Sequence, residues 1–241
     1  MQYKSETPLE DLILPVSYIE RAKALCAEGM RKILAIAGAP GSGKSTVARL
    51  LQQALPDCSV LVPMDGFHLA NKELERLGRK ERKGAPDTFD VKGYLALLQR
   101  LRNQKHDEVI YAPEFDRAIE EAIAGSIPVF PETELIITEG NYLCLTQGDW
   151  QNLVELFDEK WFVMAPQQER QQRLINRHCY FGRTPKEAKT WVEQTDEPNA
   201  RLIENNRTEV ELVIEWMDVS KRSWVKRYGG VEKKYLFVEN A

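Results

Sequence analysis

Cysteine is scarce in this sequence, and the few cysteines are scattered. The 241 residues contain four, Cys26, Cys58, Cys144 and Cys179, and no two of them form a CxxC pair. Zinc knuckles and disulfide frameworks both need cysteines at recurring spacings. The sequence therefore indicates neither kind of site.

Long apolar runs and targeting signals are also missing. No segment approaches the roughly 20 apolar residues that a membrane-spanning helix requires. The N-terminal segment MQYKSETPLEDLILPV is acidic and lacks the apolar run of a signal peptide. We therefore expect a soluble, cytoplasmic protein with no membrane partner.

The sequence has no excess of positive charge either. It contains 33 Lys and Arg against 37 Asp and Glu, for a formal net charge of −4, and no long basic block. Nucleic-acid binding has little electrostatic support in such a chain, so we expect no nucleic-acid partner. With 43% hydrophobic residues the chain can bury one sizeable core, and we expect a single domain over residues 1–241.

Strand and helix patterns alternate along the chain. Short apolar runs predict strands at 31–38, 59–65, 108–113, 134–140 and 208–217. Apolar spacing of the helical kind predicts helices at 44–55, 90–103, 165–178 and 184–194. The segment 117–130 fits either a helix or strands. The alternation predicts an α/β fold, with a mostly parallel sheet covered by helices on both faces.

Capping signals mark the ends of several predicted helices. Ser17 and Glu20 fit a capping box, with Gly29 as the stop of a first helix. Asp90 is the expected N-cap of the helix at 90–103. Thr184, with glutamate three residues later, fits a second capping box.

The segment GAPGSGKST matches the phosphate-loop pattern GxxxxGK[ST]. It lies between a predicted strand and a predicted helix, which is the context that the motif requires; an ordinary glycine-rich turn is the alternative. Glycines let backbone N–H groups approach phosphate oxygens, and the helix N-terminus adds its dipole. The predicted nucleotide-binding residues are Gly38, Ala39, Pro40, Gly41, Ser42, Gly43, Lys44, Ser45 and Thr46. Within this set Lys44 neutralises the β- and γ-phosphates, and the Ser45 hydroxyl is a predicted Mg²⁺ ligand.

Two acidic residues end predicted strands near this loop. Asp65 ends the strand at 59–65, and Glu139 lies at the end of the strand at 134–140. In an open α/β sheet the ligand lies at the carboxyl ends of the strands, so both carboxylates can face the same crevice. Asp65 can accept the proton of an attacking hydroxyl or hold a magnesium-bound water, and Glu139 can support Mg²⁺. The alternatives are a turn aspartate and a solvated glutamate.

Arginines follow on the helix predicted at 165–178. Arg170, Arg173 and Arg177 lie at i, i+3 and i+7, hence on one helical face, and Arg183 follows at a glycine turn. Arginines on a helical hairpin can close over phosphates and neutralise transition-state charge. We predict a lid-like helical segment over 167–200, with a solvated helix paired with glutamates as the alternative.

Four motifs together resemble a known family. The run GAPGSGKST, VPMDGFH, RKGAPDTFD and IITEGNYL is similar to the P-loop kinases that include uridine kinases, phosphoribulokinases and bacterial-type pantothenate kinases. The likeness covers roughly residues 30–215 and is greatest to bacterial relatives labelled nucleoside or nucleotide kinase-like, some assigned to fructose. It implies a P-loop NTPase fold that binds ATP and Mg²⁺, with strands within 117–130.

The resemblance also assigns roles to residues. It implies that Asp65 is the base for the acceptor hydroxyl, that Glu139 supports magnesium, and that arginines of the lid clamp phosphates. On this basis the catalytic set is Lys44, Asp65, Glu139 and Arg177, and Arg173 and Arg183 join the nucleotide-binding set. YAPEFDR, residues 111–117, resembles the stretch that contacts the acceptor. The predicted substrate-side residues are Asp65, His68, Tyr111, Asp116 and Arg117.

The sequence departs from uridine kinases at two places. Gly66 stands where they usually carry serine, and PEFDR replaces their YDF…H acceptor pattern. We therefore expect an ATP-dependent kinase that phosphorylates a hydroxyl of a small molecule, which is a nucleoside, a sugar or a pantothenate-like compound. The alternative is an accessory or regulatory P-loop NTPase without an acceptor.

A GTPase is disfavoured, because the nearest match to its NKxD motif, NKEL, ends in leucine. Assembly as a homodimer is left open.

Overall fold

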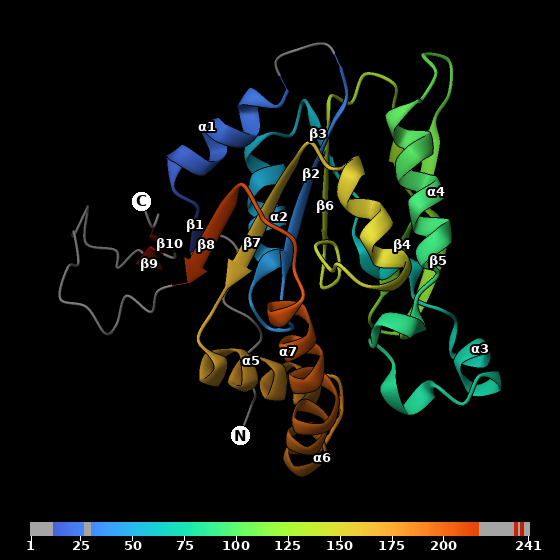
Figure 1. The fold of residues 1–241 in the computed structure, drawn as a ribbon, viewed down its shortest axis with the longest axis vertical. Coiled ribbons are helices and arrows are strands. Elements are labelled where there is room, and N and C mark those ends of the chain that lie inside the picture. The colour runs from blue at the N-terminus through green and yellow to red at the C-terminus, as the bar shows by residue number, and fades with distance from the viewer. Residues whose placement is uncertain (1–11, 27–29, 217–233, 236, 239–241) are drawn as a thin grey trace.

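A six-stranded sheet forms the centre of the molecule (Figure 1). The computed structural model describes residues 12–26, 30–216, 234–235 and 237–238. The strands, in spatial order, are β10 (Phe237–Val238), β8 (Leu212–Trp216), β7 (Glu159–Met164), β2 (Lys32–Gly38), β6 (Leu135–Gly140) and β3 (Ser59–Leu61). Neighbouring strands from β8 to β3 pair in parallel, and β10 is antiparallel to β8. The mostly parallel sheet that the sequence predicted is confirmed.

Helices and a hairpin bury both faces of this sheet. On one face, α1 (Val16–Ala24) and α2 (Lys44–Ala54) pack against Leu34, Ile36 and Trp161. On the other face, α4 (Val91–Arg102) packs against Ile33 and Ala35. The two sets alternate along β2 because successive side chains of a strand point to opposite faces. Within the described residues no helix is long and apolar enough to cross a membrane.

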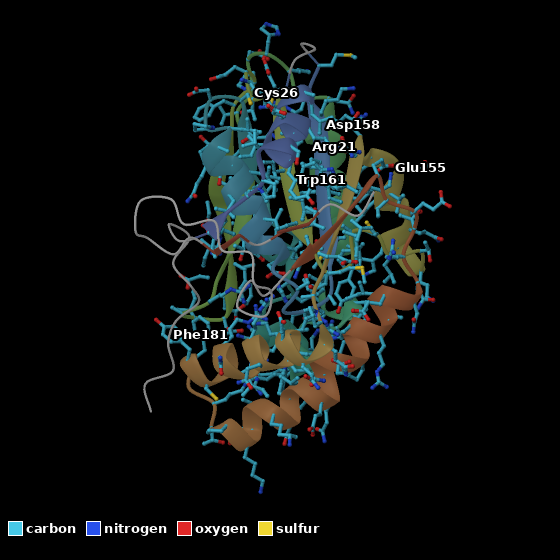
Figure 2. The ribbon with its side chains drawn as sticks, turned by 90° about the vertical axis from the view of Figure 1, so that its left-hand side faces the viewer. Arg21, Cys26, Glu155, Asp158, Trp161 and Phe181 are labelled. Carbon is cyan, nitrogen blue, oxygen red and sulfur yellow. The ribbon has the colours of Figure 1, made fainter. Side chains whose placement is uncertain are left out.

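A buried carboxylate ties α1 to the sheet. Glu159, at the start of β7, accepts a hydrogen bond from Trp161 Nε1 at 2.9 Å and pairs with the guanidinium of Arg21 on α1. Figure 2 shows Arg21 and Trp161 close together beside α1. A carboxylate that is only 8% exposed needs such partners, because an unpaired buried charge is costly.

A β-hairpin lies beside the third strand of the chain. Its strands, β4 (Ile110–Asp116) and β5 (Glu121–Val129), are antiparallel, with a register shift between Ala112 and Glu114. Ile110, Ala112 and Val129 join the core on the α4 side of the sheet. The segment 117–130, which fits two structures by sequence, therefore folds mostly as a strand.

Three helices cover the carboxyl ends of the strands (Figure 1). They are α5 (Gln167–Tyr180), α6 (Pro185–Trp191) and α7 (Glu197–Asn205), with a π-helical turn at Val192–Asp196 between the last two. The predicted capping box of α6 is confirmed, since the Thr184 side chain accepts from the Glu187 backbone N–H. The remaining short elements are α3 (Asn71–Arg76), β1 (Leu12–Ile13) and β9 (Lys234–Tyr235).

Several local predictions differ from the structure. The capping box at Ser17 and Glu20 is wrong: α1 begins at Val16, Pro15 is the N-cap residue, and no side chain caps the helix. The predicted stop, Gly29, lies outside the described residues. The strand expected over 208–217 is shorter, covering Leu212–Trp216, and position 217 also lies outside the described part. Strand β7 was missed because its continuous apolar stretch, WFVM, is only four residues long.

The strand expected to end in Asp65 is also shorter than predicted. β3 ends at Leu61, and Asp65 lies in a 3₁₀ turn, Met64–Phe67. The hairpin approaches this turn very closely at Gly66, where an added Cβ would lie 2.3 Å from the Pro113 carbonyl oxygen of β4. A side chain at position 66 therefore has no room unless the hairpin moves.

We predict that Gly66→Ala lowers the free energy of unfolding by about 1–3 kcal/mol, because overpacking displaces the hairpin backbone. Urea denaturation monitored by circular dichroism measures this change. Ala70→Ser is the matched control, since it adds a hydroxyl at the exposed, uncapped N-cap position of α3. The control should unfold at an equal or slightly higher urea concentration. An unchanged urea midpoint for Gly66→Ala would show that the hairpin can move away from position 66 without loss of stability.

Candidate nucleotide and acceptor site

The segment between β2 and α2 has the backbone of a phosphate cradle. Gly43 has φ of 95°, a left-handed conformation that favours glycine, and it is the N-cap residue of α2. No side chain caps α2, so its first N–H groups are available to a ligand. The Ser42 hydroxyl is buried without a hydrogen-bond partner in the described part of the chain. An orphan donor beside an uncapped helix N-terminus fits phosphate oxygens.

Lys44 carries its charge in a half-buried position, and the charges of two carboxylates act on it. Burial lowers the pKa of Lys44, and the charges of Glu139 and Asp65 act in the opposite direction. Burial raises the pKa of Glu139, more than the Lys44 charge lowers it. This arrangement gathers groups from α2, β6 and the turn after β3 at one end of the sheet. It fits an anionic ligand that would neutralise Lys44 and bring its own cation.

The side chains of Ser45 and Glu139 could hold that cation. They are hydrogen-bonded to each other, and Glu139 is only 5% exposed. Hydroxyl and carboxylate oxygens are hard donors of the type that Mg²⁺ takes. Among the described residues no group of three or more His, Cys, Asp or Glu is placed to hold a metal. Protein ligands this few suit Mg²⁺, which completes its shell with phosphate oxygens and water.

Asp65 is held in its turn by a partner from the hairpin. Arg117 Nη2 donates to Asp65 Oδ2 at 3.1 Å. Burial disfavours the charged form of Asp65. In the acidic range where this carboxyl titrates, protonated His68 together with Arg117 and Lys44 outweighs burial and holds the pKa of Asp65 below the usual range. Burial lowers the pKa of His68 itself. The imidazole is therefore neutral at pH 7. At that pH, Arg117 and Lys44 supply positive charge that acts on Asp65.

His68 is fixed by stacking and by one backbone contact. Its Nδ1 lies 2.8 Å from the Asp65 carbonyl oxygen, to which a neutral ring with a proton on Nδ1 donates. Its ring lies 4.0 Å from the Phe89 ring and 4.6 Å from the Phe115 ring, between centroids. His68 thus connects the turn carrying Asp65 to the hairpin.

The other predicted hairpin residues lie differently. Tyr111 is 58% exposed. The exposed Asp116 accepts the Ala118 N–H at 2.8 Å within the hairpin turn. Of the predicted hairpin residues that the structure describes, Arg117 is the one that contacts Asp65.

Two arginines of α5 hold the phosphate loop from outside. Arg170, 2% exposed, donates to the Pro40 carbonyl oxygen at 3.3 Å and pairs with Glu197 and Glu204. Arg173 donates to the Gly41 carbonyl oxygen, also at 3.3 Å. Both guanidinium groups therefore contact loop carbonyls, which fixes the position of α5 against the loop.

The remaining lid arginines occupy different surroundings. The charge of Arg177 contributes to lowering the pKa of both Lys44 and Asp65, which places it near the centre of the site. Arg183 stacks on Trp191, with 3.7 Å from its Cζ to the ring centroid. Among these arginines, the charge of Arg177 therefore reaches Lys44 and Asp65, whereas Arg183 packs on Trp191 of α6.

Lys83 is a further residue beside the hairpin that the sequence did not single out. Its ammonium lies 5.1 Å from the centroid of Phe115, the ring that stacks on His68. Lys83 belongs to RKGAPDTFD, one of the four motifs of the family resemblance. The motif marks the segment, but only the docking of the hairpin shows which side chain of it reaches the site.

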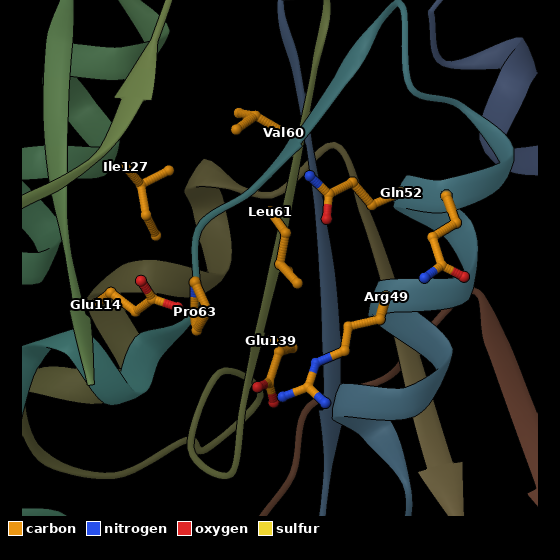
Figure 3. A pocket seen from close by; sticks show the side chains of 9 residues that line it. Arg49, Gln52, Val60, Leu61, Pro63, Glu114, Ile127 and Glu139 are labelled. Atoms are coloured by element: carbon orange, nitrogen blue, oxygen red, sulfur yellow. The ribbon is translucent and has the colours of Figure 1, made fainter. Parts of the chain in front are cut away.

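A cavity of about 400 Å³ adjoins the site beside Glu139 (Figure 3). Three elements form its walls: α2, the edge strand β3 with the residues after it, and the hairpin. Figure 3 shows the guanidinium of Arg49 directed toward the carboxylate of Glu139. The lining residues are Arg49, Gln52, Gln53, Val60, Leu61, Pro63, Glu114, Ile127 and Glu139.

Comparisons with known proteins agree on the kind of protein and differ on its substrate. A Schizosaccharomyces pombe protein named "Putative uridine kinase C227.14" is 32% identical over 206 residues, 81% of this chain and 87% of that protein. A Ligilactobacillus salivarius pantothenate kinase is 34% identical over 139 residues, 55% of this chain and 44% of that kinase. A crystal structure titled "putative fructose transport system kinase", from Silicibacter sp. TM1040, superposes with a TM-score of 0.75 at 36% identity, covering 83% of this chain and 99% of that one. No family model matches the chain.

A glycine-rich loop between β2 and α2, facing carboxylates from the neighbouring β3 and β6 segments, defines a P-loop nucleotide-binding fold. The relatives narrow this class further. The chain belongs to the P-loop kinase family that includes uridine kinases and pantothenate kinases. The three relatives carry three different acceptor names, so membership of the family does not name the acceptor of this chain.

We predict that Lys44→Ala weakens ATP binding by about 100-fold, the usual worth of a charge-assisted contact in a buried site. Calorimetric titration with ATP measures the affinity. Lys186→Ala, at an exposed position of α6, removes the same charge from the surface and should leave the affinity unchanged. If the two variants bind ATP with equal affinity, the nucleotide does not bind at this loop.

We also predict that Arg117→Ala raises the pKa of Asp65. The parent protein keeps Asp65 ionised to a lower pH than the variant does, because Arg117 favours the charged form. The stability contributed by this contact is present above the ordinary aspartate pKa and is lost as the pH falls through the lowered one. NMR titration of ¹³C-labelled aspartate carboxyls measures the shift, with Asp65→Asn identifying the signal. Arg100→Ala removes an arginine paired with Glu108 and should leave that signal in place.

Proposed function

We propose that the protein is an ATP-dependent kinase that transfers the γ-phosphate to a hydroxyl of a small molecule. The observation that carries the proposal is the position of Asp65. Its carboxylate is held below its usual pKa, next to the charges of Lys44 and Glu139, at the end of the sheet where the phosphate loop lies. A carboxylate in that place is ionised at neutral pH and stands beside the bound nucleotide.

The proposed step moves one proton and one phosphoryl group. The acceptor hydroxyl oxygen attacks the γ-phosphorus of ATP, its proton passes to Asp65, and ADP leaves with the electrons of the broken P–O bond. Lys44 and the uncapped N-terminus of α2 bind the β- and γ-phosphates. The charge of Arg177 lowers the pKa of Lys44, on the nucleotide side of this reaction, and of Asp65, on the acceptor side. Arg177 therefore stabilises charge that develops on the transferred group.

Magnesium, when bound, would offset the negative charge of the phosphates. Ser45 and Glu139 are the side chains that would hold it, directly or through water. The raised pKa of Glu139 means that this carboxyl takes up a proton at a higher pH than an ordinary glutamate does. Metal affinity would therefore begin to fall earlier on acidification than at an exposed carboxylate.

The names of the relatives support a small acceptor with a hydroxyl group. The printed names include uridine and pantothenate kinases and a fructose transport system kinase. An accessory NTPase without an acceptor is the competing reading. It would consume ATP at one slow rate whatever alcohol is added, whereas a kinase would accelerate with its acceptor.

The decisive variant is Asp65→Asn, which keeps the shape of the side chain but cannot take up the acceptor proton. We expect ATP and magnesium to bind with nearly unchanged affinity and phosphoryl transfer to fall by about 10²–10⁴-fold. Turnover, ATP affinity, magnesium dependence and melting temperature should be measured on the same preparation. A rate restored by excess magnesium would instead make Asp65 a metal ligand. Normal turnover with a lowered melting temperature would leave it a turn residue.

A further inference from the structure

The surface beside Asp65 gathers two cations around one aromatic ring. Lys83 Nζ lies 5.1 Å from the centroid of the Phe115 ring, and Arg117 Cζ lies 6.0 Å from the same centroid. Lys83 comes from the segment that follows α3, and Arg117 from the hairpin turn. Aromatic faces attract cations, so Phe115 helps to hold Lys83 and Arg117 beside one ring, and Arg117 contacts the proposed base.

The charge of Lys83 is only partly balanced in this structure. Its ammonium donates to Asn71 Oδ1 at 2.8 Å and to the backbone carbonyl of Glu120, and both acceptors are neutral. No carboxylate of a described residue lies within ion-pair distance of it. Burial lowers the pKa of Lys83, and the more distant charges of Glu120 and Glu121 offset this only in part. A partly buried ammonium that is bonded only to neutral acceptors is stabilised by an anionic partner.

Arg117 has one carboxylate partner among the described residues, and that partner is Asp65 itself. In the proposed function Asp65 must receive the acceptor hydroxyl, so the acceptor has to enter at this ion pair. A hydroxyl on Asp65 places the neighbouring atoms of the acceptor within reach of Arg117, whose Nη2 is 3.1 Å from Asp65 Oδ2. An anionic group there would replace the contact that Arg117 makes with the base.

The other acidic groups of the hairpin do not cancel this positive charge. The Asp116 carboxylate accepts the Ala118 N–H at the exposed turn. The Glu121 carboxylate accepts the Asn71 backbone N–H at 3.0 Å. Glu114 lines the cavity that adjoins the site beside Glu139. His68 contributes no charge at pH 7, since burial lowers its pKa. Among the described residues none of these carboxylates forms an ion pair with Lys83 or Arg117, and the charges of Glu120 and Glu121 offset that of Lys83 only in part.

We propose that the acceptor is an anionic alcohol, which presents its hydroxyl to Asp65 and a carboxylate or phosphate to Arg117 and Lys83. This inference rests on the proposed kinase function and adds to it the chemical class of the substrate. It makes Lys83 and Arg117 specificity residues. A neutral alcohol would leave both cations without a partner on the ligand, and a site built for a charged group discriminates strongly against such a compound.

Matched pairs of alcohols test the substrate class. ATP consumption is measured with glycerate and glycerol, pantothenate and pantothenol, fructose 6-phosphate and fructose, and uridine 5′-monophosphate and uridine. The first two pairs probe a carboxylate, and the last two probe a phosphate. We expect stimulation by an anionic member and little or none by its neutral partner. Raising the salt concentration should increase the KM for the anionic acceptor.

Charge variants then connect the preference to the two residues. Lys83→Gln should raise the KM for the anionic acceptor by about tenfold while kcat and the KM for ATP change little. Arg117→Lys should retain most of the preference, and Arg117→Gln should lose it. Lys80→Gln is the matched control, because Lys80 is an exposed lysine of the same segment that pairs with Glu75. This control should behave as the parent protein does.

The outcomes separate the two proposals. Stimulation by a neutral alcohol that equals or exceeds its anionic partner overturns the substrate class and leaves the kinase function standing. The same holds if the KM for the anionic acceptor is unchanged in Lys83→Gln and in Arg117→Gln. If no alcohol of either kind raises ATP consumption, although ATP binds, the kinase function fails and the inference falls with it.

Discussion

The surrounding structure has to hold together the charged side chains that meet at the carboxyl ends of β2, β3 and β6, where Glu139 is buried and Lys44 and Asp65 are half-buried. Lys44, Asp65 and Glu139 come from three separate segments. The charge of Lys44 lowers the pKa of both carboxyls, and both carboxylates act to raise the pKa of Lys44. Burial penalises every one of these charges, and opposite charge is the compensation available inside the protein. The fold therefore has to bring all three segments to the same place. The parallel sheet does so, because it ends its strands on one edge.

The elements around the cluster can be understood as its supports. From the lid, Arg170 and Arg173 bond the carbonyls of Pro40 and Gly41 and so position the loop that precedes Lys44. From the hairpin, Arg117 bonds Asp65. In the proposed reaction, α5 acts on the nucleotide half of the site and the hairpin on the acceptor half. The cluster would then lie between these halves, on the path of the transferred phosphoryl group.

The sequence predicted best what is encoded locally. The strand before the phosphate loop, the loop itself, α2 and the capping box at Thr184 all depend on residues within one short segment. Strand β7 was missed because a short apolar stretch carries little signal, and the cap of α1 was wrong because Pro15 takes the position assigned to Ser17. The contact of Arg117 with Asp65 joins positions 52 residues apart. The family resemblance pointed to both residues, but spacing could not place them together.

The close approach of Gly66 to the Pro113 carbonyl also bears on how such a site can diverge. The turn that carries Asp65 and the strand that leads to Arg117 touch through backbone, with no side chain between them to adjust. The two segments therefore behave as one module. A turn with serine at position 66 would clash with this hairpin. Exchange of acceptor preference between family members would require both segments to be replaced together.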